Sequence, residues 1–168
     1  MRNISFFLTT QQYIDYLKDI TRRFGWITLL PGQHLMAVEK AQGLGKGGKI
    51  RKLGECICIS NVPEPLNEII KRPYRPIKDY DTWSGYKDIC PHRGAVHAGY
   101  YTCAHVGNNH GCLCLYNECP GGSEVVREGF PKMTPQEFVE MFCKANSKGK
   151  KKCYPETVIN RIQFKRVD

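Results

Sequence analysis

The feature that most constrains the fold is a break in composition near the middle of the chain. From about residue 71 to residue 122 of the 168 residues, proline, glycine, cysteine and histidine are frequent, and no helical or strand periodicity is sustained. Segments with regular apolar patterns lie on both sides of this stretch. The sequence therefore predicts one domain built from residues 1–70 and 123–168, with residues 71–122 as a Cys/His-rich insertion outside it.

Four segments have the short alternating or β-branched patterns that are typical of strands. The clearest is residues 55–62, in which Cys56 and Cys58 share one face and are expected to be small core residues. The others are residues 2–8, 34–39 and 158–164. We expect these four strands to close one small β-barrel.

Two helix starts are visible in the sequence. One lies at Thr9 or Thr10, and the other at Thr134, which is followed by Pro135 at the first helical position and by Glu137 at the third. Together with the strands, these helices predict an α+β fold, a small barrel with short helices.

A basic motif follows the first helix start. Residues 18–23 read Lys-Asp-Ile-Thr-Arg-Arg, and we expect them to end that helix, with Lys18 and Thr21 facing the same way. An amine beside a hydroxyl can form a base and nucleophile pair if burial lowers the pKa of the amine. Arg22 and Arg23 suit a phosphate or a carbonyl-rich base edge. The alternative is a solvated basic cap at the end of a helix.

The net charge is +9, from 25 basic and 16 acidic residues. The basic residues cluster near positions 46–52, 71–78 and 148–152, a pattern that favours RNA or DNA as a partner but also serves solubility alone. No run approaches the roughly 20 apolar residues of a membrane helix, so we expect no membrane partner. The N-terminus lacks the features of a signal peptide, which indicates a cytoplasmic, reducing compartment for the nine cysteines.

The order of these parts resembles a known family. A strand and short helix precede Lys-x-x-Thr-x-Arg, then come Pro-Gly-Gln and a strand, a second strand ending in Pro-Glu-Pro-Leu, then Arg-Glu-Gly-Phe, a helix and a strand. This arrangement looks like an ASCH domain over roughly residues 2–70 and 123–166. The resemblance implies a PUA-like β-barrel that binds RNA or another nucleic acid, or acts as an enzyme on it.

Within that family the motif is nearest to the N(4)-acetylcytidine amidohydrolase group. The resemblance implies amide cleavage on an N(4)-acylated, cytidine-like pyrimidine by Lys18, Thr21 and Glu128, with Glu124 as the alternative carboxylate. Arg23 matches the motif arginine and is expected to hold the modified nucleoside, with Arg22 beside it. The alternatives are a non-catalytic RNA- or DNA-binding module and a ribonuclease.

The insertion carries a set of candidate metal ligands. Zinc in proteins takes four Cys or His ligands, and a segment poor in core residues gains order from a metal. We expect one structural zinc, although buried or free thiols and a redox role remain open. His92, His105 or Cys114 can each replace a member of the best set, which is Cys90, Cys103, Cys112 and Cys119.

Overall fold

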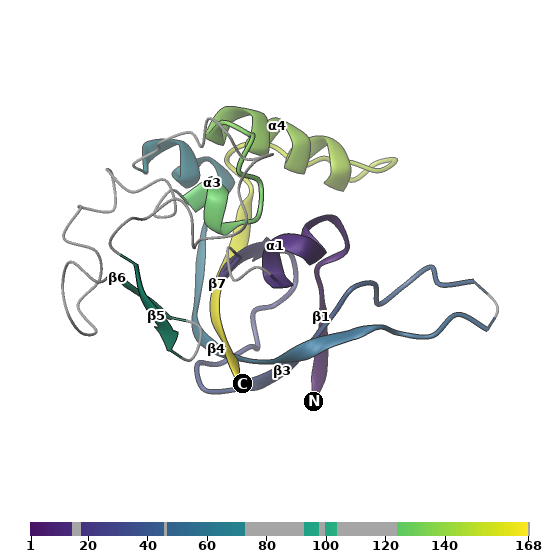
Figure 1. Cartoon of the computed structure of the whole chain (residues 1–168). Coiled ribbons are helices and arrows are strands. Elements are labelled where there is room, and N and C mark those ends of the chain that lie inside the picture. The colour runs from purple at the N-terminus through teal and green to yellow at the C-terminus, as the bar shows by residue number, and fades with distance from the viewer. Residues whose placement is uncertain (15–17, 46, 73–92, 98–99, 104–123, 168) are drawn as a thin grey trace.

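The computed structural model describes residues 1–14, 18–45, 47–72, 93–97, 100–103 and 124–167, of which 93–97 and 100–103 are described by their backbone alone. One five-stranded sheet, in the order β1-β3-β4-β7-β2, organises the molecule (Figure 1). Only β1 and β3 run parallel; the other neighbours in this sheet are antiparallel. The strands are β1 (Arg2–Ser5), β2 (Ile20–Arg23), β3 (His34–Val38), β4 (Lys52–Pro65) and β7 (Val158–Val167).

The helices are short and gather mainly at one end of the sheet. Figure 1 shows α3, α4 and η2 together at the top, whereas both chain termini lie at the opposite end. The helix α1 and the 3₁₀ turn before it connect β1 to β2. The helical elements are η1 (Phe7–Thr9), α1 (Thr10–Ile14), η2 (Leu66–Lys71), α3 (Glu124–Arg127) and α4 (Pro135–Asn146). None of the helices in the described part of the chain is long and apolar enough to cross a membrane.

The sheet curls into a half-barrel and leaves a seam between its two edge strands, β1 and β2, which are not paired with each other. The Arg23 guanidinium bridges this seam by donating a hydrogen bond to the Ser5 carbonyl. The expectation of a barrel closed by four strands was therefore wrong in two respects. The sheet has a fifth strand, and no strand pairing seals the edge in the described residues.

That fifth strand is β2, which we had expected to be the end of a helix. Its residues pair antiparallel with residues 160–163 of β7, and Thr21 lies opposite Ile162. Ile20 and Thr21 are β-branched, which disfavours a helix and suits a pleated, half-buried surface. The partner strand β7, 140 residues away along the chain, supplies the hydrogen bonds that a lone helical turn would lack.

The other strand and helix predictions are largely confirmed. The predicted strands 34–39, 55–62 and 158–164 correspond to β3, β4 and β7, while the first strand stops at Ser5. Cys56 and Cys58 are buried in the core, as expected. At α4, Thr134 accepts a hydrogen bond from the Glu137 backbone, and the Glu137 carboxylate accepts one from the backbone of Thr134. This reciprocal pair is the predicted cap.

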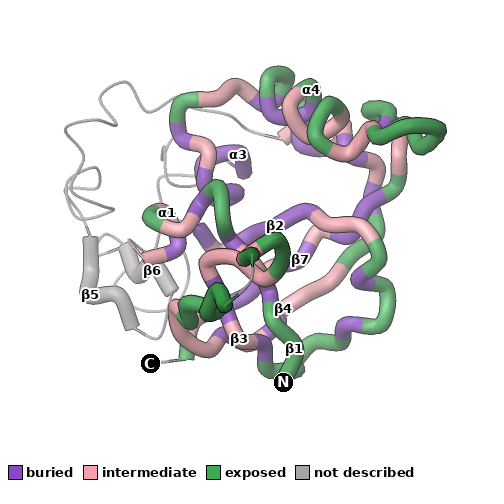
Figure 2. Tube along the Cα trace, turned by 90° about the vertical axis from the view of Figure 1, so that its right-hand side faces the viewer, coloured by how far each residue is buried: buried purple, intermediate pink, exposed green. Residues whose placement is uncertain are grey.

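Two apolar clusters of buried residues hold the fold together, and Figure 2 marks the buried stretches of the chain in purple. The first fills the concave side of the curled sheet and includes Phe6, Tyr13 and Phe164, whose rings stack against one another. The second joins η2, α3 and α4 to β7 and centres on Phe138 and Ile159. Residues of both clusters line one pocket.

Two strands fall in the predicted insertion. β5 (Arg93–His97) and β6 (Tyr100–Cys103) pair antiparallel as a separate two-stranded sheet. Within the described residues, the five-stranded sheet takes no strand from residues 71–122. The remainder of the predicted insertion lies outside the described residues.

Candidate functional site

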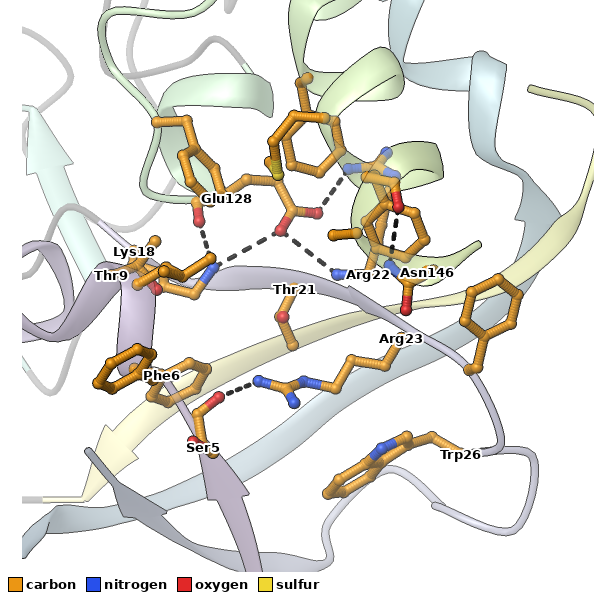
Figure 3. A pocket seen from close by; sticks show the side chains of 18 residues that line it. Ser5, Phe6, Thr9, Lys18, Thr21, Arg22, Arg23, Trp26, Glu128 and Asn146 are labelled. Atoms are coloured by element: carbon orange, nitrogen blue, oxygen red, sulfur yellow. Dashed lines mark hydrogen bonds and ion pairs between the residues drawn. The ribbon is translucent and has the colours of Figure 1, made fainter. Parts of the chain in front are cut away.

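A pocket of about 460 Å³ opens at the seam between β1 and β2 (Figure 3). Its volume lies in the range of small-molecule sites, which are mostly apolar with a few convergent polar groups. The apolar lining is strongly aromatic and comes from the turn after β1, the segment after β2, the turn after α3, and α4. Its aromatic members are Phe6, Phe7, Phe24, Trp26, Phe130, Phe138 and Phe142.

The predicted polar residues Lys18, Thr21, Arg22, Arg23 and Glu128 all line this pocket. They come from two places more than 100 residues apart in sequence. The expectation that Glu128 and the basic motif lie in one pocket is therefore confirmed. Whether these residues catalyse a reaction is a separate question.

Strand geometry sorts the basic motif into two faces. Alternate side chains of a strand point to opposite sides, so Thr21 and Arg23 share one side and Arg22 points to the other. Figure 3 shows Thr21 and Arg23 on the side of Ser5 and Trp26, with Arg22 directed towards Glu128. The helical face expected for Lys18 and Thr21 was wrong, because Thr21 is in a strand and Lys18 precedes it.

Lys18 is an almost fully buried amine. Its Nζ donates hydrogen bonds to the carbonyls of Ile20, at 2.8 Å, and Glu128, and it lies 3.5 Å from Glu128 Oε2. Burial lowers the pKa of Lys18 to about 8, although the negative charge of Glu128 acts in the opposite direction. A base with a pKa near 8 is partly neutral at physiological pH, which an ordinary lysine is not.

Glu128 is positioned by the way α3 ends. The Phe130 amide bonds to the Val125 carbonyl and the Gly129 amide to the Val126 carbonyl, which is the Schellman pattern of helix termination. Gly129 has a φ of +93°, and a Cβ there would lie 2.8 Å from Cβ and Cγ2 of Thr9. Only glycine fits this turn. The turn directs the Glu128 carboxylate towards β2.

Arg22 is the centre of a buried ion-pair network. Its side chain is fully buried and bonds three carboxylates, each at 2.7 Å, from Glu64, Glu124 and Glu128. The Arg22 backbone amide also donates to Glu128 Oε2 at 3.3 Å. Both terminal nitrogens of its guanidinium are thus engaged by carboxylates, whereas its buried Nε has no hydrogen-bond partner among the described residues. The structure gives Arg22 the position of a residue that holds Glu128, not of one that contacts a ligand.

The rest of that network surrounds Glu124. Arg72 and Arg161 both pair with this carboxylate, and Arg72 also pairs with Glu64. Burial tends to raise the pKa of Glu124, but the hydrogen bond from Arg161 and the charge of Arg22 outweigh it and hold the pKa at about 2. Glu124, the alternative carboxylate of the sequence prediction, is therefore an anchor of the network.

The Thr21 hydroxyl makes no hydrogen bond with any described residue, although the residue as a whole is largely buried. The expected contact with the Lys18 amine is not made, because that amine is occupied by backbone carbonyls and Glu128. A hydroxyl without a partner in a pocket is available to a ligand. A rotation of the Lys18 side chain is needed before it can accept a proton from Thr21.

Arg23 is the cation that the pocket leaves accessible to a ligand. Burial lowers its pKa, and its Nη2 is held by the Ser5 carbonyl across the seam. The guanidinium lies 6.0 Å from the Trp26 ring, which also has Arg2 stacked on it at 3.6 Å. Arg23 therefore presents both positive charge and hydrogen-bond donors beside an aromatic surface.

Some residues of the site were not predicted from the sequence. Asp19 forms a two-point ion pair with Arg127, at 2.8 and 2.7 Å, which fastens the start of β2 to α3. Asn146, at the end of α4, lines the pocket and is discussed below. The sequence signal for this ion pair was Asp19 itself, an acidic residue inside a basic motif.

The predicted zinc ligands cannot be placed in the same way. Cys90, Cys112 and Cys119 lie outside the described residues, and Cys103 is described only by its backbone at the end of β6. Among the residues whose side chains are described, no cluster of three or more potential ligands occurs.

We still expect metal analysis of protein purified without added metal to show close to one zinc per chain, because the cysteine-rich segment is poor in core-forming residues and gains order from a metal. Protein free of zinc, with all nine thiols titratable under native conditions, would contradict this prediction.

Comparisons with known proteins add no further constraint: no family model matches the chain, and no curated protein or solved structure matches it. What the fold and site define is a mixed α/β protein with a curled five-stranded sheet and an aromatic pocket that contains a buried lysine.

Proposed function

We propose that the protein is an ASCH-like domain that binds a modified nucleoside in this pocket and hydrolyses an amide on an N(4)-acylated, cytidine-like pyrimidine. The observation that carries the proposal is the presence, in one pocket, of a buried lysine whose pKa is lowered to about 8 and of a threonine hydroxyl that has no partner among the described residues. A neutral amine near a free hydroxyl is the minimum needed for a base and a nucleophile.

Atoms and protons balance over the two steps of the proposed reaction. Thr21 Oγ1 attacks the acyl carbonyl carbon while Lys18 Nζ takes the hydroxyl proton. The C–N bond then breaks, the leaving exocyclic amine takes that proton back, and the acyl group stays on Thr21 as an ester. Water hydrolyses the ester, which releases the carboxylic acid and restores the hydroxyl. Glu128 positions the Lys18 amine, and Arg22 in turn holds Glu128.

The pocket chemistry suits a nucleobase. Aromatic side chains offer stacking surfaces to a planar ring. Arg23 can donate hydrogen bonds to the carbonyl or ring nitrogen of a pyrimidine edge. The test is a hydrolysis screen of N(4)-acetylcytidine and related acylated cytidines, with product amine and acid both quantified. Absence of turnover on every acylated cytidine would overturn the enzymatic proposal.

The lowered pKa of Lys18 makes a prediction about pH. We expect kcat/KM to rise with pH and to level off above about pH 8, because only the neutral amine accepts the hydroxyl proton. The stability should follow the same group. Its folded pKa lies below the unfolded value of 10.5, so the unfolded chain holds more protons between pH 8 and 10.5, and the free energy of unfolding rises with pH there.

The measurement is a pH–rate profile together with urea unfolding at several pH values. In Lys18→Met the increase in stability between those pH values should be smaller than in the native protein. A rate that is flat from pH 6 to 9 would contradict the role of Lys18 as the base.

A non-catalytic nucleic-acid-binding module is the second candidate, and one observation favours it. The exposed basic turn at residues 148–152 lies beside Phe24, which lines the pocket, with the Lys151 ammonium 4.9 Å from the centre of the Phe24 ring. Phosphate contacts from such a turn would make binding fall steeply with salt. A salt titration of single-stranded RNA and DNA binding distinguishes this candidate, since a free nucleoside lacks those phosphates.

A further inference from the structure

The side-chain amide of Asn146 has a defined orientation. It lies on the last turn of α4, and its Nδ2 donates a hydrogen bond of 2.8 Å to the Phe142 carbonyl. A carbonyl oxygen can only accept, so the NH₂ end of the amide must face Phe142. The Oδ1 atom is consequently turned away, and Figure 3 shows it directed to the side of the pocket where Arg23 lies.

Two complementary atoms in the pocket thus lack hydrogen-bond partners in the part of the chain that the structure describes. No described residue donates a hydrogen bond to Asn146 Oδ1, and none accepts one from Arg23 Nη1, since the Ser5 carbonyl is bonded by Nη2. Neither atom is among the buried atoms left without a hydrogen bond, so both remain accessible. Oδ1 is an acceptor and Nη1 is a donor. A ligand that satisfies both must carry an N–H or O–H group and an acceptor.

We infer that Asn146 is a specificity-determining residue that accepts the N–H of a bound secondary amide, while Arg23 donates to an acceptor on the same ligand. This inference rests on the proposed function and adds to it the part of the ligand that is recognised. On an N(4)-acylated cytosine, the exocyclic N–H is the donor, and the ring nitrogen and carbonyl are the acceptors. The free nucleoside cytidine offers a similar edge but lacks the acyl group that would reach Thr21.

The consequence is discrimination against a methylated amide. A methyl group on the exocyclic nitrogen removes the only N–H of the amide and leaves Asn146 Oδ1 without a donor. A lost hydrogen bond of this kind is worth about tenfold in affinity. Asn146→Leu has a side chain of similar size and no acceptor, so it should bind the two ligands alike.

The experiment is a calorimetric titration in a Thr21→Val background, which removes the proposed nucleophile and slows turnover. The probes are N(4)-acetylcytidine and its N(4)-methylated form. We expect Thr21→Val alone to prefer the first by about tenfold, and the double variant with Asn146→Leu to lose that preference. Because both ligands are measured on the same protein, a general loss of folding lowers both affinities and leaves their ratio unchanged.

The control is Asn67→Leu, on η2 and outside the pocket lining, which should retain the preference. A preference that persists undiminished in the Asn146→Leu variant overturns the role of Asn146 and leaves the proposed function standing. Equal binding of the two probes by Thr21→Val alone also overturns the role of Asn146 and leaves the proposed function standing. If Thr21→Val binds neither cytidine, both the proposed function and the recognition of its amide fall.

Discussion

Thr21→Val should lower kcat/KM for hydrolysis of an N(4)-acylated cytidine by about a hundredfold or more, with little change in stability. Valine has nearly the shape of threonine and removes only the hydroxyl, which has no partner among the described residues. The loss therefore reports on the nucleophile and not on packing. Lys18→Met should have an effect of similar size, because the hydroxyl then lacks its base.

Thr28→Val and Lys52→Met are matched controls for these two changes. Both residues are exposed and neither lines the pocket, so both variants should keep native rates. The measurement is steady-state kinetics, with thermal unfolding to verify the fold. If Thr21→Val retains full turnover, Thr21 is not the nucleophile.

Arg22→Met should reduce the free energy of unfolding by about 3–5 kcal/mol, which is a large share of the stability of a small domain. The Arg22 guanidinium is fully buried and neutralises parts of three carboxylates. Removing it leaves Lys18 as the ion-pair partner of Glu128 among the described residues, while Arg72 and Arg161 still hold Glu124. A buried carboxylate with too little positive charge around it is strongly destabilising.

Arg51→Met is the corresponding surface change. Arg51 is exposed, and its pair with Glu39 spans 3.5 Å, so its removal should alter stability by no more than about 0.5 kcal/mol. Urea unfolding of both variants at neutral pH provides the comparison. A cost for Arg22→Met no larger than for Arg51→Met would show that the network is not a source of stability.

The same network should make the fold sensitive to acid. The folded pKa of Glu124, about 2, lies below its ordinary value of 4.5. Its contribution to stability is therefore complete above the ordinary value and is lost as the pH falls towards 2. Urea unfolding from pH 6 down to pH 3 should show this loss, and Glu124→Gln should weaken the dependence. Equal acid sensitivity in Glu124→Gln would assign the effect to other carboxylates.

Local patterns were sufficient for the elements that carry their own signal. The alternation of residues 55–62 predicted the central part of β4, and Thr134 with Glu137 predicted the start of α4, because a cap or a strand face is specified within a few residues. The Cys56 and Cys58 burial followed from the same alternation. The length of this strand was not predicted. β4 extends beyond residue 62 to Pro65, and its second half is paired with β7 throughout.

The secondary structure of the basic motif could not be predicted from its local sequence. The four residues of the motif that form β2, Ile20–Arg23, are too few to favour a strand over a last helical turn by themselves. Their pairing with β7 makes them a strand. Once the segment is a strand, side chains alternate, so Arg22 turns towards the buried carboxylates while Arg23 faces the Ser5 side of the pocket. A change of secondary structure over four residues thus reassigned one of the two predicted substrate-binding arginines.

By itself, the sequence determined four of the five strands of the main sheet, where α4 begins, and that Lys18, Thr21 and a distal glutamate are candidate site residues. Only the tertiary structure decided the partners of those residues. The carboxylates around Arg22 come from β4, α3 and the turn after it, so their meeting depends on how the sheet curls and how η2, α3 and α4 pack over its end. Hydrogen-bonded caps and alternating strands are local, whereas burial of a charge and the pKa it imposes depend on residues brought together from distant parts of the chain.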